Sequence, residues 1–233
     1  TKGDRLWIVD PDAGTTLVGQ DTSADTVAGS LDYPVMSITV DPSGERLFAA
    51  RVDGGGRVNV YDSTGAKTGE ILVARNVIAV RWDSAHDELV ALSQPQGGAW
   101  HILVLPGGSE SGMTTISRPV NLQSGSATTL AVDGDYYYLA GSALWRVKRD
   151  GTGSWSTSLS PASAEDVEVV GSEVGVLHKF GPSIEADYYF SRLATYRTSD
   201  GAAVATRQSR FESKHMAVTS GLFVVGNGGD ASV

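Results

Sequence analysis

Short stretches of alternating apolar and polar residues, separated by turn-forming residues, run along the whole chain. Residues 36–72 show this pattern most completely. The segments MSITV and RVNVY alternate apolar and polar residues, RLFAA is apolar after its first residue, and KTGEIL follows as the fourth segment; DPSG, DGGG and DSTG separate them. Alternation with a period of two predicts strands, and Asp, Pro and Gly between them predict tight turns. Residues 36–72 are therefore predicted to form a four-stranded antiparallel meander.

The same order of strands and turns recurs along the chain. Predicted first strands begin near residues 36, 77, 128, 165 and 215. These starts lie roughly 40 to 50 residues apart, which is the length of one propeller blade. A single twisted four-stranded sheet cannot bury both of its faces, so it is stable only when other copies stack on it. The last copy has two strands, and a strand pair in residues 1–18 matches the two that it lacks.

The repeats predict an all-β fold: one five-bladed β-propeller domain over residues 1–233, closed by pairing N-terminal strands with the C-terminal half blade. The predicted blades are approximately 36–75, 76–118, 127–160, 165–208, and 215–233 together with 1–18. The alternatives are a six-bladed propeller and a β-sandwich with turns at similar spacing.

Residues 36–72 resemble the blades of bacterial propeller repeats of the YVTN and NHL type. The likeness rests on an apolar strand, the turn Asp41-Pro42-Ser43-Gly44, a short apolar strand, a Gly-rich turn, the strand Val58-Asn59-Val60-Tyr61-Asp62 and a Thr-Gly turn. The family tends to have Val-x-Val-Ile-Asp in that third strand. The resemblance implies a propeller fold in a bacterial protein. Members commonly have six or seven blades, whereas this chain has room for five.

The composition argues against nucleic acids and membranes as binding partners. The 18 Lys and Arg against 27 Asp and Glu give a formal charge of −9, which repels nucleic-acid phosphates and anionic membrane surfaces. No stretch approaches the roughly 18 apolar residues of a membrane-spanning helix, so direct membrane insertion is not expected either. The absence of cysteine excludes disulfides and thiolate chemistry. The acidic, Ser-, Thr- and Gly-rich composition favours an exported bacterial protein that is secreted, periplasmic or at the cell surface.

The residues that precede the five first strands form the candidate site. In a propeller the first strand of each blade lines the central channel, so these residues are expected to meet in one funnel that suits a polar ligand such as a sugar. They are Tyr33, Arg75, Asn76, Thr128, Glu165, Asp166, Lys214 and His215. The alternative interpretation is that Glu165 and Asp166 form ion pairs with Arg75 and Lys214 at the edge of the ring.

The predicted function is a non-catalytic binding or scaffold propeller that recognises a protein or a glycan through its faces. The competing hypothesis is a hydrolase or lyase acting on a carbohydrate or lactone, with Glu165 or Asp166 as acid or base and His215 assisting. A third possibility is a subunit of a surface complex. No cofactor is expected. No metal site is expected either, because His86, His101, His178 and His215 lie in different copies and no Asp-Gly turn has calcium-loop spacing.

Overall fold

The computed structural model describes residues 5–10, 16–21, 35–51, 56–73, 76–94, 99–160, 163–180, 190–209, 213 and 215–225, and within them all regular structure is β-strand. The prediction of an all-β fold is therefore confirmed. The chain divides into two compact units, Thr1–Ser117 and Arg118–Val233. Each unit contains two four-stranded antiparallel sheets and one two-stranded sheet among its described residues.

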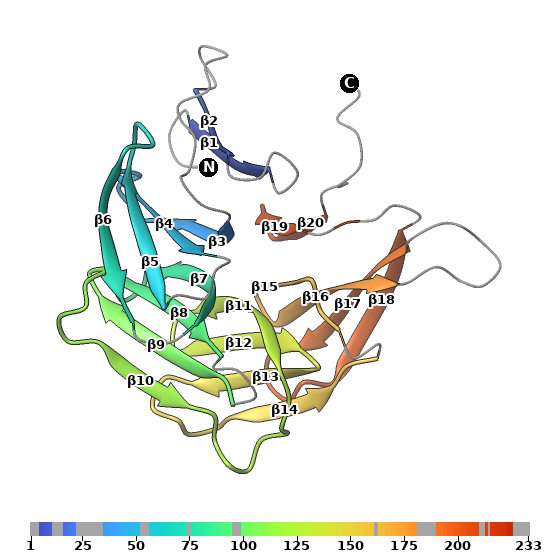
Figure 1. Ribbon diagram of the computed structural model, residues 1–233. Coiled ribbons are helices and arrows are strands. Elements are labelled where there is room, and N and C mark those ends of the chain that lie inside the picture. The colour runs from blue at the N-terminus through green and yellow to red at the C-terminus, as the bar shows by residue number, and fades with distance from the viewer. Residues whose placement is uncertain are drawn as a thin grey trace. The chain divides into compact units, whose positions relative to one another are not determined.

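The N-terminal unit begins with a hairpin and continues with two meanders. The strands are β1 (Arg5–Asp10), β2 (Thr16–Asp21), β3 (Val35–Val40), β4 (Arg46–Arg51), β5 (Arg57–Asp62), β6 (Lys67–Leu72), β7 (Val77–Asp83), β8 (Glu88–Ser93), β9 (His101–Pro106) and β10 (Thr114–Ser117). Figure 1 shows the sheets β3–β6 and β7–β10, each with its strands in chain order. The four-stranded meander predicted for residues 36–72 is thus confirmed.

The C-terminal unit has two meanders followed by a hairpin. The strands are β11 (Ala127–Asp133), β12 (Tyr136–Gly141), β13 (Ala143–Lys148), β14 (Trp155–Ser158), β15 (Asp166–Val170), β16 (Glu173–Phe180), β17 (Phe190–Arg197), β18 (Ala203–Ser209), β19 (Met216–Thr219) and β20 (Leu222–Val225). The hairpins β1–β2 and β19–β20 each form a two-stranded sheet. The predicted pairing of these two halves, the count of five blades and the single domain stay predictions.

Adjacent sheets in the N-terminal unit pack face to face. Phe48 and Val58 of the first sheet share one buried core with Val80 and Leu103 of the second. The first strands β3 and β7 lie against each other, and side-chain hydroxyls join them. Ser37 Oγ accepts a hydrogen bond from Val80 N at 3.1 Å, and Thr39 Oγ1 accepts one from Trp82 N at 3.0 Å. Contact between the first strands of successive sheets is the arrangement of neighbouring propeller blades.

The C-terminal unit repeats this arrangement. Its first strands β11, β15 and β19 contact one another in succession. Tyr138 and Leu144 of β11–β14 share a buried core with Val174 and Val176 of β15–β18. The hairpin β19–β20 packs on the far face of β15–β18, where Phe223 occupies the space above Gly175. A Cβ at Gly175 would lie 2.7 Å from the Phe223 ring.

Three of the first strands carry a β-bulge at the same place. The register shifts between Val35 and Ser37 in β3, between Val77 and Ala79 in β7, and between Ala127 and Thr129 in β11. The extra residues are Met36, Ile78 and Thr128. A bulge bends its strand and redirects a side chain. The bulge therefore determines which side chain each of these three strands presents at its start.

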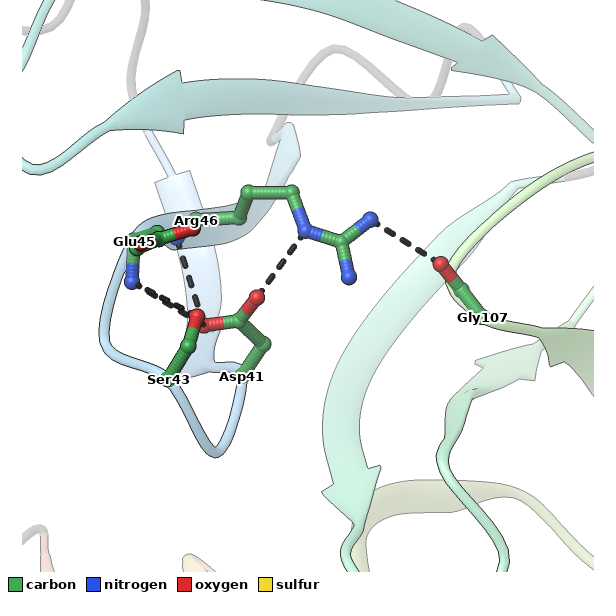
Figure 2. A network of polar contacts seen from close by, with 5 residues as sticks. All are labelled: Asp41, Ser43, Glu45, Arg46 and Gly107. Atoms are coloured by element: carbon green, nitrogen blue, oxygen red, sulfur yellow. Dashed lines mark hydrogen bonds and ion pairs between the residues drawn. The ribbon is translucent and has the colours of Figure 1, made fainter.

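A residue of the sheet β3–β6 bonds to the turn between β9 and β10, the third and fourth strands of the next sheet. Arg46 donates from Nε to Asp41 Oδ2 at 2.9 Å and from Nη1 to Gly107 O at 3.0 Å (Figure 2). Burial alone would raise the pKa of Asp41, but hydrogen bonds from Arg46 and Ser43 outweigh it and lower that pKa. Asp41 is therefore ionised at neutral pH, and its pair with Arg46 anchors the β9–β10 turn.

An equivalent contact occurs in the C-terminal unit. Trp155 Nε1 donates to Thr198 O at 3.0 Å, and Arg146 Nη1 donates to Ser199 O at 3.3 Å. In both units a glycine with positive φ lies under an aromatic ring. A Cβ at Gly108 (φ +68°) would lie 2.7 Å from Phe48 Cζ, and one at Gly201 (φ +70°) would lie 2.6 Å from Trp155 Cζ3.

These contacts predict that Gly108→Ala and Gly201→Ala destabilise the fold more than the backbone conformation alone explains. The control is Gly134→Ala, because Gly134 also has positive φ (+53°) but no atom within 4 Å of the position that a Cβ would take. We expect about 1 kcal/mol for the control from left-handed strain, and about 1–3 kcal/mol more for the other two from steric overlap. Urea denaturation measures the difference. Equal losses in all three variants would contradict the packing described.

Candidate functional site

Three of the predicted funnel residues lie where successive first strands of the C-terminal unit begin. Thr128 is the bulge residue of β11, Glu165 immediately precedes β15, and His215 immediately precedes β19. All three side chains are exposed. We call Thr128, Glu165 and His215 the entry cluster.

The Asp166 carboxylate joins the three strands that carry the entry cluster. Asp166 is buried, with 5% of its surface exposed. Its Oδ1 accepts hydrogen bonds from Thr129 Oγ1 at 3.2 Å and Val167 N at 2.9 Å, and its Oδ2 accepts one from Met216 N at 2.8 Å. A carboxylate is stable in a buried position only when hydrogen bonds replace its water. Asp166 therefore connects β11, β15 and β19.

The segment that leads into β15 is fixed at each residue. Ser163 O accepts a hydrogen bond from His178 Nδ1 at 2.6 Å. Ala164 O accepts one from Thr128 Oγ1 at 2.9 Å, and Glu165 N donates to Leu177 O at 2.8 Å. The Glu165 side chain thus projects into solvent from a backbone held on both sides, which is the rigid support that a binding group needs.

The remaining predicted residues fall elsewhere. Asn76 belongs to the N-terminal unit, where it precedes β7, is half-buried, and accepts a hydrogen bond from Gln94 N at 3.0 Å through its backbone carbonyl. Tyr33, Arg75 and Lys214 lie outside the described residues. The ion pairs proposed between the two acids and Arg75 or Lys214 therefore stay a prediction, and the structure brings together Thr128, Glu165, Asp166 and His215.

The entry cluster offers one carboxylate, one imidazole and one hydroxyl to a ligand. The Thr128 hydroxyl directs its hydrogen toward Ala164 O or Ala140 O, 3.2 Å away, so toward a ligand it acts as an acceptor. Glu165 is an acceptor, while His215 can donate or accept. Among the residues that the structure describes, no three His, Cys, Asp or Glu side chains form a group that could hold a metal ion. Such a set suits a ligand rich in hydroxyl or amide groups.

Sequence reasoning missed the residues that join the strands. Thr129 bonds to Asp166, and Ser37 and Thr39 bond to the backbone of β7. The available signal was the occurrence of Ser or Thr in the first strands β3 and β11, where apolar residues dominate.

No helix of the described residues is long and apolar enough to cross a membrane.

No protein-family model matches the chain, and no curated protein matches it. Solved structures do match. The β-propeller domain of Cps50 (Swd1) from Myceliophteria thermophila is 15% identical with a TM-score of 0.56, covering 88% of this chain and 82% of that one. Hydrazine synthase from Kuenenia stuttgartiensis is 18% identical with a TM-score of 0.57, covering 79% of this chain and 52% of that one. This chain thus spans about half of the hydrazine synthase chain. At these identities the likeness concerns the fold, which is that of a β-propeller.

Proposed function

We propose that the chain is a five-bladed propeller, closed when β1–β2 pairs with β19–β20 to form the fifth blade. Two observations support this. The sheet β3–β6 is buried on both faces, since Phe48 faces β7–β10 while Leu47 and Tyr61, on the opposite face, are each 1% exposed. The hairpin β19–β20, in contrast, leaves Leu222 65% and Val224 46% exposed. In a closed ring another blade packs on the second face of β3–β6. Closure also covers the apolar residues that the half blade β19–β20 leaves exposed.

The function that the site supports best is non-catalytic binding or scaffolding, in an exported bacterial protein that recognises a protein or a glycan. The entry cluster is the contact surface, together with Tyr33, Arg75 and Asn76 from the other blade entrances and Lys214 beside His215. One observation carries this: the buried acid, Asp166, bonds to Thr129 and Met216, while the exposed groups stand on a fixed backbone. Among the described residues, the buried acid is thus bonded to the neighbouring strands, and the groups left for a ligand are polar and exposed.

The second candidate is a hydrolase or lyase acting on a carbohydrate or lactone. Glu165 and His215 favour it, because they are exposed titratable groups at the starts of adjacent first strands linked through Asp166. General acid–base catalysis requires two such groups in one site. In this hypothesis Asp166 holds the pair in position and exchanges no proton with the substrate.

The test is a glycan array and an affinity pull-down with the intact chain and the variant Glu165→Gln/His215→Asn. Removing one hydrogen bond to the charged Glu165, of about 1.5–3 kcal/mol, and one to neutral His215, of about 0.5–1.5 kcal/mol, should weaken binding roughly 30- to 2,000-fold. Glu173→Gln is the control, since it makes the same charge change at the opposite end of the β15–β16 hairpin and should leave the affinity unchanged. A ligand that the double variant still binds fully would place recognition on another surface. Cleavage of an array glycan that the double variant abolishes would favour the enzyme.

A further inference from the structure

His178 is a buried histidine that the proposed binding function does not use. It lies in β16, has no exposed surface, and follows Val174 and Val176 on the strand face that packs against β11–β14. Its Nδ1 lies 2.6 Å from Ser163 O. Because a carbonyl only accepts hydrogen bonds, Nδ1 carries a proton, and in the neutral ring Nε2 is then unprotonated. Nε2 is buried without a hydrogen-bond partner among the described residues.

The charged group opposite His178 is a cation. Arg192 in β17 is its cross-strand partner, and it donates from Nη1 to Ser160 O at 3.0 Å. The carboxylates of β15, Asp166 and Glu168, alternate with Val167 and Val169, whose side chains join the core shared with β11–β14. They therefore point to the other face of β15 from Val167 and Val169, and the Asp166 carboxylate is bonded to Thr129, Val167 and Met216. On the segment before β15, Glu165 is exposed.

The remaining titratable groups of this core, among the described residues, are tyrosines: Tyr138 and Tyr196 are buried in it, and Tyr136 packs against it partly buried. Tyr138 comes from β12, and Tyr196 comes from β17. Burial raises the pKa of Tyr138 to about 12 and also raises that of Tyr196. Both are therefore neutral at and below physiological pH. A second proton on His178 would have no carboxylate to pair with among the described residues of this core.

Protonation of His178 is consequently unfavourable while the ring stays in place. Burial, and to a smaller degree the Arg192 charge, lower its pKa, although the bond to Ser163 O acts in the opposite direction. When the segment opens and water reaches the ring, His178 regains an ordinary pKa near 6.5. Below about pH 6.5 the open state therefore binds a proton that the closed state does not, and falling pH favours opening.

We propose that His178 is a pH-sensitive latch on residues 163–166, which release from the sheet on acidification and carry Glu165 out of the entry cluster. The observations that point to it are the buried ring, its bond to the Ser163 carbonyl at the start of this segment, and the absence of a partner for Nε2 among the described residues. The expected consequence is ligand release at low pH, and this consequence rests on the proposed function. The opening of residues 163–166 does not depend on the proposed function.

Hydrogen exchange measured by mass spectrometry on the whole chain tests the latch without a ligand. After correction for intrinsic exchange rates, protection of peptides covering 163–166 should fall up to about 10-fold per pH unit below about pH 6.5. The variant His178→Asn keeps a donor near the Nδ1 position but cannot be protonated, so its protection should not vary with pH. His101→Asn, which replaces a half-buried histidine of the N-terminal unit, should retain the wild-type pH dependence. Constant protection in the wild type, or an unchanged slope in His178→Asn, would overturn the proposal.

Imidazole ¹⁵N NMR of the wild type keeps the proposal falsifiable if His178→Asn does not fold. The His178 resonances should show the Nδ1–H tautomer at neutral pH, and the loss of protection at 163–166 should follow protonation of this ring. Protonation of His178 at an ordinary pKa with no change in protection would refute the latch. Because neither measurement contains a ligand, failure of the binding proposal leaves their outcome unaffected and is recognised separately.

Discussion

Replacing Asp166 with alanine should lower the free energy of unfolding by roughly 2–4 kcal/mol. The substitution leaves the Thr129 hydroxyl and the Met216 amide, both buried in the native fold, without the acceptor that they now share. Each unpaired buried donor costs about 1–3 kcal/mol. Because the carboxylate joins three first strands, the loss should appear as a lower midpoint of one cooperative transition. Chemical denaturation monitored by tryptophan fluorescence measures it.

Two further variants separate the contribution of Asp166 from a general effect of charge. Thr129→Val removes one of the three hydrogen bonds and should cost about 1 kcal/mol. Glu165→Gln removes the neighbouring charge from an exposed side chain and should change stability by less than about 0.5 kcal/mol. If Asp166→Ala is as stable as Glu165→Gln, the carboxylate does not hold the strands together. Asp166 would then again be a candidate for direct ligand binding.

Asp166 also shows where reasoning from sequence stops. The repeat predicted that Glu165 and Asp166 lie where β15 begins, and the structure places them there. It could not predict which of the two would be buried. Consecutive residues at a strand end point to opposite sides, so a shift of one residue in register exchanges the exposed and the buried acid. That register follows from the packing of β15 between β11 and β19, which involves segments far apart in the sequence.

The strands themselves were predictable because two local signals agree. Alternation marks each strand, and Asp with Gly marks each turn, as in Asp62-Ser63-Thr64-Gly65, where Asp62 Oδ1 accepts hydrogen bonds from Thr64 N at 2.8 Å and Ala66 N at 3.1 Å. The bulges at Met36, Ile78 and Thr128 were not predictable, since an extra residue in a strand alters neither composition nor the turn. The entry cluster depends on one of them. The repeat predicted that residues before the first strands gather in one place. It did not predict that the Thr128 hydroxyl bonds to backbone carbonyls of neighbouring segments.

Deleting residues 1–21, which removes β1 and β2, should abolish cooperative unfolding of the remaining chain. In the proposed ring these strands complete the blade begun by β19–β20, and that blade covers the face of β3–β6 that carries Leu47 and Tyr61. Exposing two such side chains costs about 1.5–3 kcal/mol each, to which the unpaired edge of β20 adds. A total stability of about 5–15 kcal/mol is typical of a domain, so this loss removes much of it. Deletion of residues 226–233, which follow β20, is the control and should leave the calorimetric transition intact. A truncated protein that melts cooperatively at the temperature of the full chain would exclude closure, because a ring held by its N-terminal strands cannot keep its stability without them.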